Sequence, residues 1–246
     1  MAQACDIARL RQSSKNCYPR LHILSSPQQR LKVSKPMTHI VLLGDSIFDN
    51  GRYTMGGPDV ISQVRQLLPV GWRASLLAVD GSTAEDVPSQ LQHMPTDASH
   101  LVLSVGGNDA LMNSDILHMP ADSTSQAIGK LADVSKQFEG KYRKAVSDCK
   151  RVGLPLTLCT IYNGCFPDAD FQRAVSTALM VFNDVILRVG IESGLPIIDL
   201  RFVCSSPSDY ANPIEPSSDG GAKIARTIVN LVAGRSQDAE ARIVIA

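Results

Sequence analysis

Short apolar runs alternate with segments of helical periodicity from residue 39 onward. The apolar runs are rich in Leu or β-branched residues, are bounded by Gly, Pro or Asp, and lie at 39–43, 74–79, 100–105, 155–161 and 196–200. Their length and composition are typical of buried parallel strands. Between and after them, apolar residues recur three and four apart, which predicts helices at about 58–68, 83–93, 123–152, 168–192 and 218–234.

This alternation predicts an α/β fold with three layers, in which helices cover both faces of a five-stranded parallel sheet. The predicted strand order is the flavodoxin-like order 2-1-3-4-5. A chain of 246 residues fits one such domain. We assign this domain to residues 37–234, and we expect residues 235–246 to form a C-terminal tail.

Residues 1–36 have a different composition, with seven Lys or Arg residues against one acid, Asp6. No apolar segment follows these basic residues, so residues 1–36 do not have the pattern of a secretory signal peptide. We expect a disordered N-terminal extension, and the open alternatives are an organelle-targeting segment or a natural start at Met37.

Charge, apolar runs and cysteines indicate a soluble, cytoplasmic protein. The net charge is zero, so composition gives no argument for a nucleic-acid partner. No uninterrupted apolar run approaches the roughly 20 residues of a membrane helix. The six cysteines have neither C-x-x-C nor zinc spacing, so we expect reduced cysteines in a reducing compartment and no metal.

Glycine and polar residues follow three of the predicted strands. Gly44-Asp45-Ser46 ends the first, Asp80-Gly81 the second, and Gly106-Gly107-Asn108-Asp109 the third. The carboxyl ends of parallel strands meet at one edge of a sheet, where such folds bind ligands. There Ser46 offers a nucleophilic hydroxyl, and the Gly81 backbone and the Asn108 amide offer donors for a developing oxyanion.

These three blocks, in this order, resemble the SGNH (Ser-Gly-Asn-His) or GDSL hydrolase family over residues 37–234. The resemblance implies an esterase or lipase-like enzyme without a cofactor. It implies that Ser46 is the nucleophile, and that Gly81 and Asn108 contribute to the oxyanion hole.

The last block of that family, Asp-x-x-His before a Pro and a helix, is altered here. Asn212 and Glu215 stand at the Asp and His positions, and no histidine follows His118. Glu215 could act as the base if burial raised its pKa from the usual value near 4.3. The secondary candidates are His118 as an alternative base, Asp199 and Asp209 to orient or replace Glu215, and Asp45 beside the nucleophile.

Two functions therefore compete. The first is a serine-dependent hydrolase of small or acyl carboxylic esters, and the alternative is a non-catalytic protein that binds an acyl or acetyl ligand or a protein partner. The sequence contains neither the G-x-G-x-x-G motif nor a phosphate-loop lysine, so it does not predict a nucleotide-binding site. We expect the loops at 50–57, 110–122 and 163–170 to shape the pocket, with few aromatic residues to stack on a sugar. The oligomeric state is not predicted.

Overall fold

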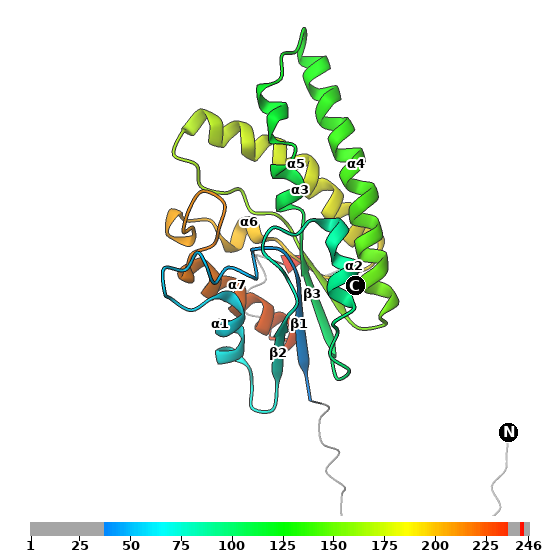
Figure 1. Cartoon of the computed structure of the whole chain (residues 1–246), viewed down its shortest axis with the longest axis vertical. Helices are drawn as coiled ribbons and strands as arrows, with labels where there is room; N and C mark the ends of the chain where they lie inside the picture. The colour runs from blue at the N-terminus through cyan, green and yellow to red at the C-terminus, as the bar shows by residue number, and fades with distance from the viewer. Residues whose placement is uncertain (1–36, 236–241, 244–246) are drawn as a thin grey trace, which may run out of the picture. The chain divides into compact units, whose positions relative to one another are not determined.

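A six-stranded sheet forms the core of the computed structural model, which describes residues 37–235 and 242–243 (Figure 1). The strands are β1 (His39–Gly44), β2 (Arg73–Leu76), β3 (His100–Ser104), β4 (Leu156–Cys159), β5 (Ile197–Ile198) and β6 (Arg242–Ile243). Their order is β2-β1-β3-β4-β5-β6, and β1 to β5 are parallel. The predicted parallel sheet and its order are confirmed. The antiparallel β6 was not predicted, since two residues carry no periodicity. The predicted extension at 1–36 lies outside the described residues.

All five predicted helical segments are helical. The α-helices are α1 (Val60–Leu67), α2 (Val87–Leu91), α3 (Gly107–Leu111), α4 (Thr124–Arg151), α5 (Ala169–Glu192), α6 (Leu200–Val203) and α7 (Ser218–Val232). In the described part of the chain, the short 3₁₀ helices are η1 (Ala84–Asp86), η2 (Ser114–His118) and η3 (Pro207–Asp209). The predicted helix at 83–93 is divided into η1 and α2, and a proline in the first turn begins α2. The helices that were not predicted are too short to show a 3.6-residue period.

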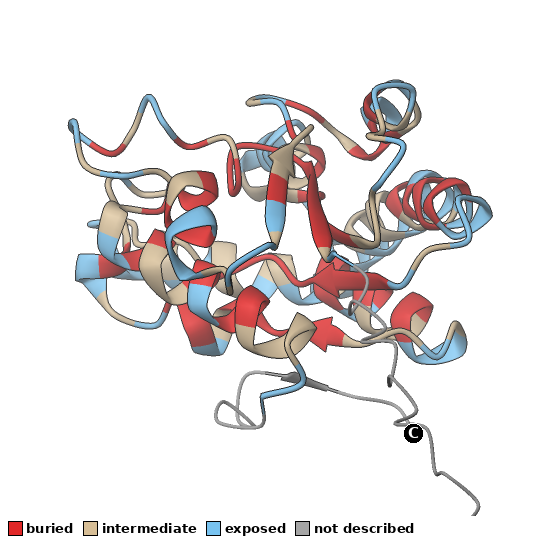
Figure 2. Ribbon diagram, turned by 90° about the horizontal axis from the view of Figure 1, so that it is seen from below, coloured by how far each residue is buried: buried red, intermediate tan, exposed pale blue. Residues whose placement is uncertain are grey.

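Alternate residues of β1 enter two separate hydrophobic cores. Ile40 and Leu42 pack on the side of α1 and α7, whereas Val41 and Leu43 pack on the side of α2, α4 and α5. Buried residues accordingly follow the strands, and exposed residues lie on the outer faces of the helices (Figure 2). The sheet is therefore covered on both faces, as the sequence predicted.

Helix α5 is, within the described residues, long and apolar enough to cross a membrane by length and composition alone. The sequence did not indicate this, because polar residues interrupt the apolar positions of α5. The inner face of α5 supplies Phe182, Val185 and Ile186 to the core, and Asn183 bonds both the N–H and the carbonyl of Ile161 at 2.8 Å. These contacts are those of a core helix that fixes the segment following β4.

The carboxyl end of β1 is held by a buried glutamine. Gln90 Oε1 accepts the Gly44 N–H at 2.8 Å, and Gln90 Nε2 donates to the Gly44 carbonyl at 2.8 Å. Gly44 has φ +127°, and a Cβ there would lie 1.7 Å from the carbonyl oxygen of Ser104. A glycine is therefore required where the ends of β1 and β3 approach each other.

Two buried tyrosines differ in whether their hydroxyl group makes a hydrogen bond. The Tyr142 hydroxyl has no hydrogen-bond partner among the described residues, whereas the Tyr162 hydroxyl donates to the Ile214 carbonyl at 2.6 Å. We expect Tyr142→Phe to keep or raise stability, because it removes an unsatisfied buried hydroxyl, and Tyr162→Phe to cost about 1 kcal/mol. Urea unfolding of both variants measures this difference. A larger loss for Tyr142→Phe than for Tyr162→Phe would contradict it.

Candidate active site

Ser46 and Glu215 are in direct contact, although 169 residues separate them in the chain. Ser46 lies in the turn after β1, and its Oγ donates a hydrogen bond to Glu215 Oε1 at 3.0 Å. Ser46 does not cap a helix, since α1 begins at Val60 and is capped by Asp59. The structure thus brings together the two residues predicted as nucleophile and base.

The Glu215 carboxylate is buried, and this burial changes its acidity. Loss of hydration raises the pKa of Glu215 to about 7, opposed by the Ser46 hydrogen bond and assisted by the negative charge of Asp80. Its second oxygen, Oε2, is buried and has no hydrogen-bond donor within the described part of the chain. A carboxylate with a pKa near neutrality and one free acceptor is suited to accept a proton.

The turn that carries Glu215 is held by its own polar side chains. Asn212 Oδ1 accepts the N–H groups of Ile214 and Glu215, both at 3.0 Å. Asn212 therefore fixes the backbone of the turn, and the carboxylate is left to Ser46. Asp209 lies before this turn, fully buried; its Oδ2 accepts the N–H of Ser206 at 2.9 Å and its Oδ1 pairs with Lys223. Asp209 thus supports the loop.

Asn50 connects the Ser46 segment to the Glu215 segment. This residue is fully buried; its Nδ2 donates to the Pro216 carbonyl at 3.1 Å, and its Oδ1 accepts the Val60 N–H at 2.9 Å. Its proximity to Ser46 in the chain was the one signal that pointed to a role at the site.

The other secondary candidates do not meet Ser46. Burial by itself would raise the pKa of Asp199. Hydrogen bonds that Arg201 and Thr160 donate to its carboxylate nevertheless hold this pKa below its usual value. His118 is exposed and stacks on Phe171 with a centroid distance of 6.2 Å. Neither His118 nor Asp199 lines the cavity at Ser46.

The two predicted oxyanion donors lie in the segments that follow β2 and β3, Gly81 in a turn and Asn108 in the first turn of α3. Asn108 Nδ2 donates to the Ser82 carbonyl at 2.9 Å, which leaves the second proton of the amide for another acceptor. Gly81 has φ +83° and open space where a Cβ would be. Within residues 37–235 and 242–243, the backbone N–H groups of Ser46 and Gly81 have no hydrogen-bond acceptor. Three donors are therefore available in the segments that follow three neighbouring strands.

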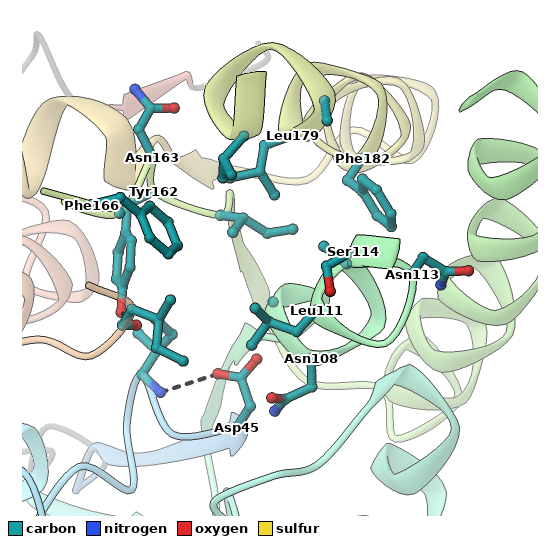
Figure 3. A pocket seen from close by; sticks show the side chains of 18 of the residues that line it. Asp45, Asn108, Leu111, Asn113, Ser114, Tyr162, Asn163, Phe166, Leu179 and Phe182 are labelled. Carbon is teal, nitrogen blue, oxygen red and sulfur yellow. Dashed lines mark hydrogen bonds between the residues drawn. The ribbon is translucent and has the colours of Figure 1, made fainter. Parts of the chain in front are cut away.

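Asp45 adds a second buried carboxyl beside Ser46 (Figure 3). Its Oδ1 accepts the Ile47 N–H at 3.1 Å. Burial raises the pKa of Asp45 to about 7, and the charges of Glu215 and Asp109 add to the effect. Through its hydrogen bond to the Ile47 N–H, Asp45 fixes the turn around Ser46.

A cavity of about 310 Å³ opens from Ser46 and Glu215. Residues of the segments 110–122 and 163–170 line it as predicted, whereas none of residues 50–57 does. Phe166, Phe171 and Phe182 line it as well, so the expectation of few aromatic residues is wrong. Two of these residues belong to α5, which the sequence did not place at this edge of the sheet.

Potential metal ligands are dispersed. Among the described residues, no group of three or more His, Cys, Asp or Glu side chains is placed to hold a metal ion. The four described cysteines, Cys149, Cys159, Cys165 and Cys204, are free, and all except Cys165 are buried.

Comparisons with known proteins agree with the fold of this chain. The sequence profile of the GDSL-like Lipase/Acylhydrolase family matches residues 42–222. No curated protein matches the chain in sequence. An extracellular lipase from Streptomyces rimosus is similar in structure, with TM-score 0.60 and 15% identity, over 81% of this chain and 100% of that chain. Also similar is a mutant of an acetyl-xylooligosaccharide esterase from Geobacillus stearothermophilus, with TM-score 0.57 and 17% identity, over 78% and 93% of the two chains.

Asn50 is expected to control the reactivity of Ser46. Asn50→Asp keeps the acceptor for the Val60 N–H but loses the donor to Pro216, so the Glu215 turn loses an anchor. We expect labelling of Ser46 by a fluorophosphonate to slow by about tenfold to a hundredfold. Thr54→Val is the control, because Thr54 bonds only within its own loop. Equal rates for Asn50→Asp and wild type would contradict the role.

The raised pKa of Glu215 also predicts a pH-dependent stability. Between about pH 4.5 and about pH 7 the folded protein binds a proton at Glu215 that the unfolded chain releases. Stability from this group is present at low pH and is lost as the pH rises. We expect the gain in unfolding free energy from Glu215→Gln to grow across this window, by at most about 1.4 kcal/mol per pH unit. A gain independent of pH, measured by urea unfolding, would show an unshifted carboxyl.

Proposed function

Because the chain belongs to the GDSL-like lipase and acylhydrolase family, we propose that it hydrolyses carboxylic esters with Ser46 as nucleophile and Glu215 as general base. The observation that carries this proposal is the hydrogen bond from Ser46 Oγ to Glu215 Oε1 at 3.0 Å. A base must lie within hydrogen-bond distance of the proton that it removes, and this geometry meets the requirement.

In the first half of the reaction, Ser46 Oγ attacks the ester carbonyl carbon while its proton moves to Glu215. The carbonyl oxygen becomes an oxyanion, which accepts hydrogen bonds from the N–H groups of Ser46 and Gly81 and from the Asn108 amide. Collapse of the tetrahedral intermediate breaks the bond to the alcohol. Glu215 returns the proton to the departing oxygen, which leaves an acyl group on Ser46.

In the second half, water hydrolyses the acyl-enzyme. Glu215 removes a proton from the water, and the resulting oxyanion is held by the same donors. Expulsion of Ser46 Oγ then releases the carboxylic acid and returns the proton to the serine. The free acceptor on Glu215 Oε2 supports a place for this water beside the carboxylate.

A glutamate replaces the histidine of the family pattern, and burial compensates for its weak basicity. An ordinary glutamate with a pKa near 4.3 would remove the proton of a serine poorly. A carboxylate whose pKa is raised to about 7 is a stronger base and is still deprotonated above neutral pH. Asp199 and Asp209 are engaged elsewhere, so this proposal uses a dyad without a third residue.

Ester hydrolysis by variants tests the dyad. We expect Ser46→Ala to lower kcat for p-nitrophenyl esters at least about a thousandfold, and Glu215→Gln to lower it by about a hundredfold to ten-thousandfold. Since the deprotonated carboxylate is the base, wild-type kcat/KM should rise with pH and level off above about 7. Stopped-assay or absorbance kinetics across this range measures both effects.

The exposed histidine supplies the matched control. His118→Ala should keep wild-type activity and pH profile. Full activity in Glu215→Gln, together with a loss in His118→Ala, would assign the base to the histidine. Absence of turnover in wild type, with no phosphonate labelling of Ser46, would instead favour the non-catalytic binding protein.

A further inference from the structure

The cavity beside Ser46 has a chemical character that narrows the substrate. It extends from Ser46 and Glu215 to the helices α4 and α5, and about 310 Å³ lies at the lower end of the size of ligand pockets, about 300–1,000 Å³. Its charged lining residues are Asp45 and Glu215, which both belong to the region around the nucleophile. The remainder is lined mainly by Leu, Ile, Val, Ala and Phe side chains.

The far wall of the cavity is apolar. In Figure 3, Leu179 and Phe182 lie across the cavity from Asp45 and Asn108. Phe182 is in turn packed on Phe138, with ring centroids 5.1 Å apart, so this wall is supported by the hydrophobic core. A ligand group that reaches this wall must be apolar, because a polar group would lose its hydrogen bonds to water there.

The polar residues of the lining offer few groups to a sugar. Among the polar side chains of the lining, Asn113 donates through Nδ2 to the Asp109 carbonyl at 2.8 Å, and Tyr162 donates its hydroxyl to the Ile214 carbonyl at 2.6 Å. Polar side chains are also few in this lining beside the apolar ones. An acetyl group, on the other hand, would leave most of the apolar volume without contact. An unbranched hydrocarbon chain fills an apolar cavity of this kind, and each buried methylene group strengthens binding by roughly threefold to fourfold.

We propose that the acyl part of the substrate is a saturated chain of medium length, from hexanoyl to dodecanoyl. The chain lies in this cavity with Leu179 and Phe182 as the wall that limits its length. This assignment rests on the proposed ester hydrolysis at Ser46, since the carbonyl carbon must sit at the nucleophile. The alcohol then leaves on the side away from the cavity.

The length limit is tested with p-nitrophenyl acetate, butanoate, octanoate, dodecanoate and hexadecanoate. We expect wild-type kcat/KM for octanoate to exceed that for acetate by at least about tenfold, and hexadecanoate to be a poor substrate. Leu179→Trp should lower the octanoate-to-acetate ratio at least about tenfold, because the indole fills the far end. Leu179→Ala should move the optimum toward dodecanoate, which keeps the test valid if the Trp variant folds poorly.

Met180→Trp is the matched control, because Met180 is the next residue of α5 and is exposed. It should keep the wild-type preference for chain length. Highest activity on acetate in wild type would overturn the inference and leave ester hydrolysis intact. An unchanged octanoate-to-acetate ratio in both Leu179 variants would overturn it as well.

A binding measurement separates this inference from the proposed function. Calorimetric titration of Ser46→Ala with methyl octanoate should show binding, and methyl acetate should show none. If no ester is hydrolysed but methyl octanoate binds, and binding is lost in the double variant Ser46→Ala/Leu179→Trp, the cavity assignment stands and the hydrolase function fails. Absence of binding by methyl octanoate would overturn the cavity assignment.

Discussion

The site depends on a carboxylate that is buried beside a serine hydroxyl. Removal of Glu215 from water is costly in its charged form, and the Ser46 hydroxyl compensates in part by donating to it. The same burial that makes the contact expensive raises the pKa of Glu215 to about 7. In the proposed mechanism Glu215 is the base, and a base with this pKa accepts protons near neutral pH. The same burial would then account for both the energetic cost of the contact and the basicity that the proposal needs.

Such a contact persists only if the loops that carry it are fixed. Buried amide side chains perform this task at three places: Gln90 at the end of β1, Asn50 between the Ser46 and Glu215 segments, and Asn183 at the segment after β4. Each of the three is buried and hydrogen-bonds to backbone N–H or carbonyl groups at or beyond the ends of strands, where regular sheet pairing stops. These hydrogen bonds hold the turns at the carboxyl edge of the sheet in fixed positions relative to the strands.

In the proposed mechanism a glutamate takes the place of the histidine of the family pattern, and this changes what the neighbouring residues must do. A histidine needs a partner that fixes its tautomer, as the aspartate does in a serine triad. A carboxylate has no tautomer to select, and Asn212, at the position of that aspartate, instead accepts the backbone N–H groups of the turn. The proposed Glu215 base and the structural role of Asn212 are therefore compatible in chemical terms.

The sequence by itself determined the fold and the first half of the site. Hydrophobic periodicity predicted the strands and long helices, because each element must bury one face, and parallel strands bring Ser46, Gly81 and Asn108 to one edge. Only the tertiary structure decided that Glu215 meets Ser46, that α5 lines the cavity and that His118 points elsewhere. These outcomes depend on how distant loops and helices pack, and no local pattern of residues encodes a contact across 169 positions.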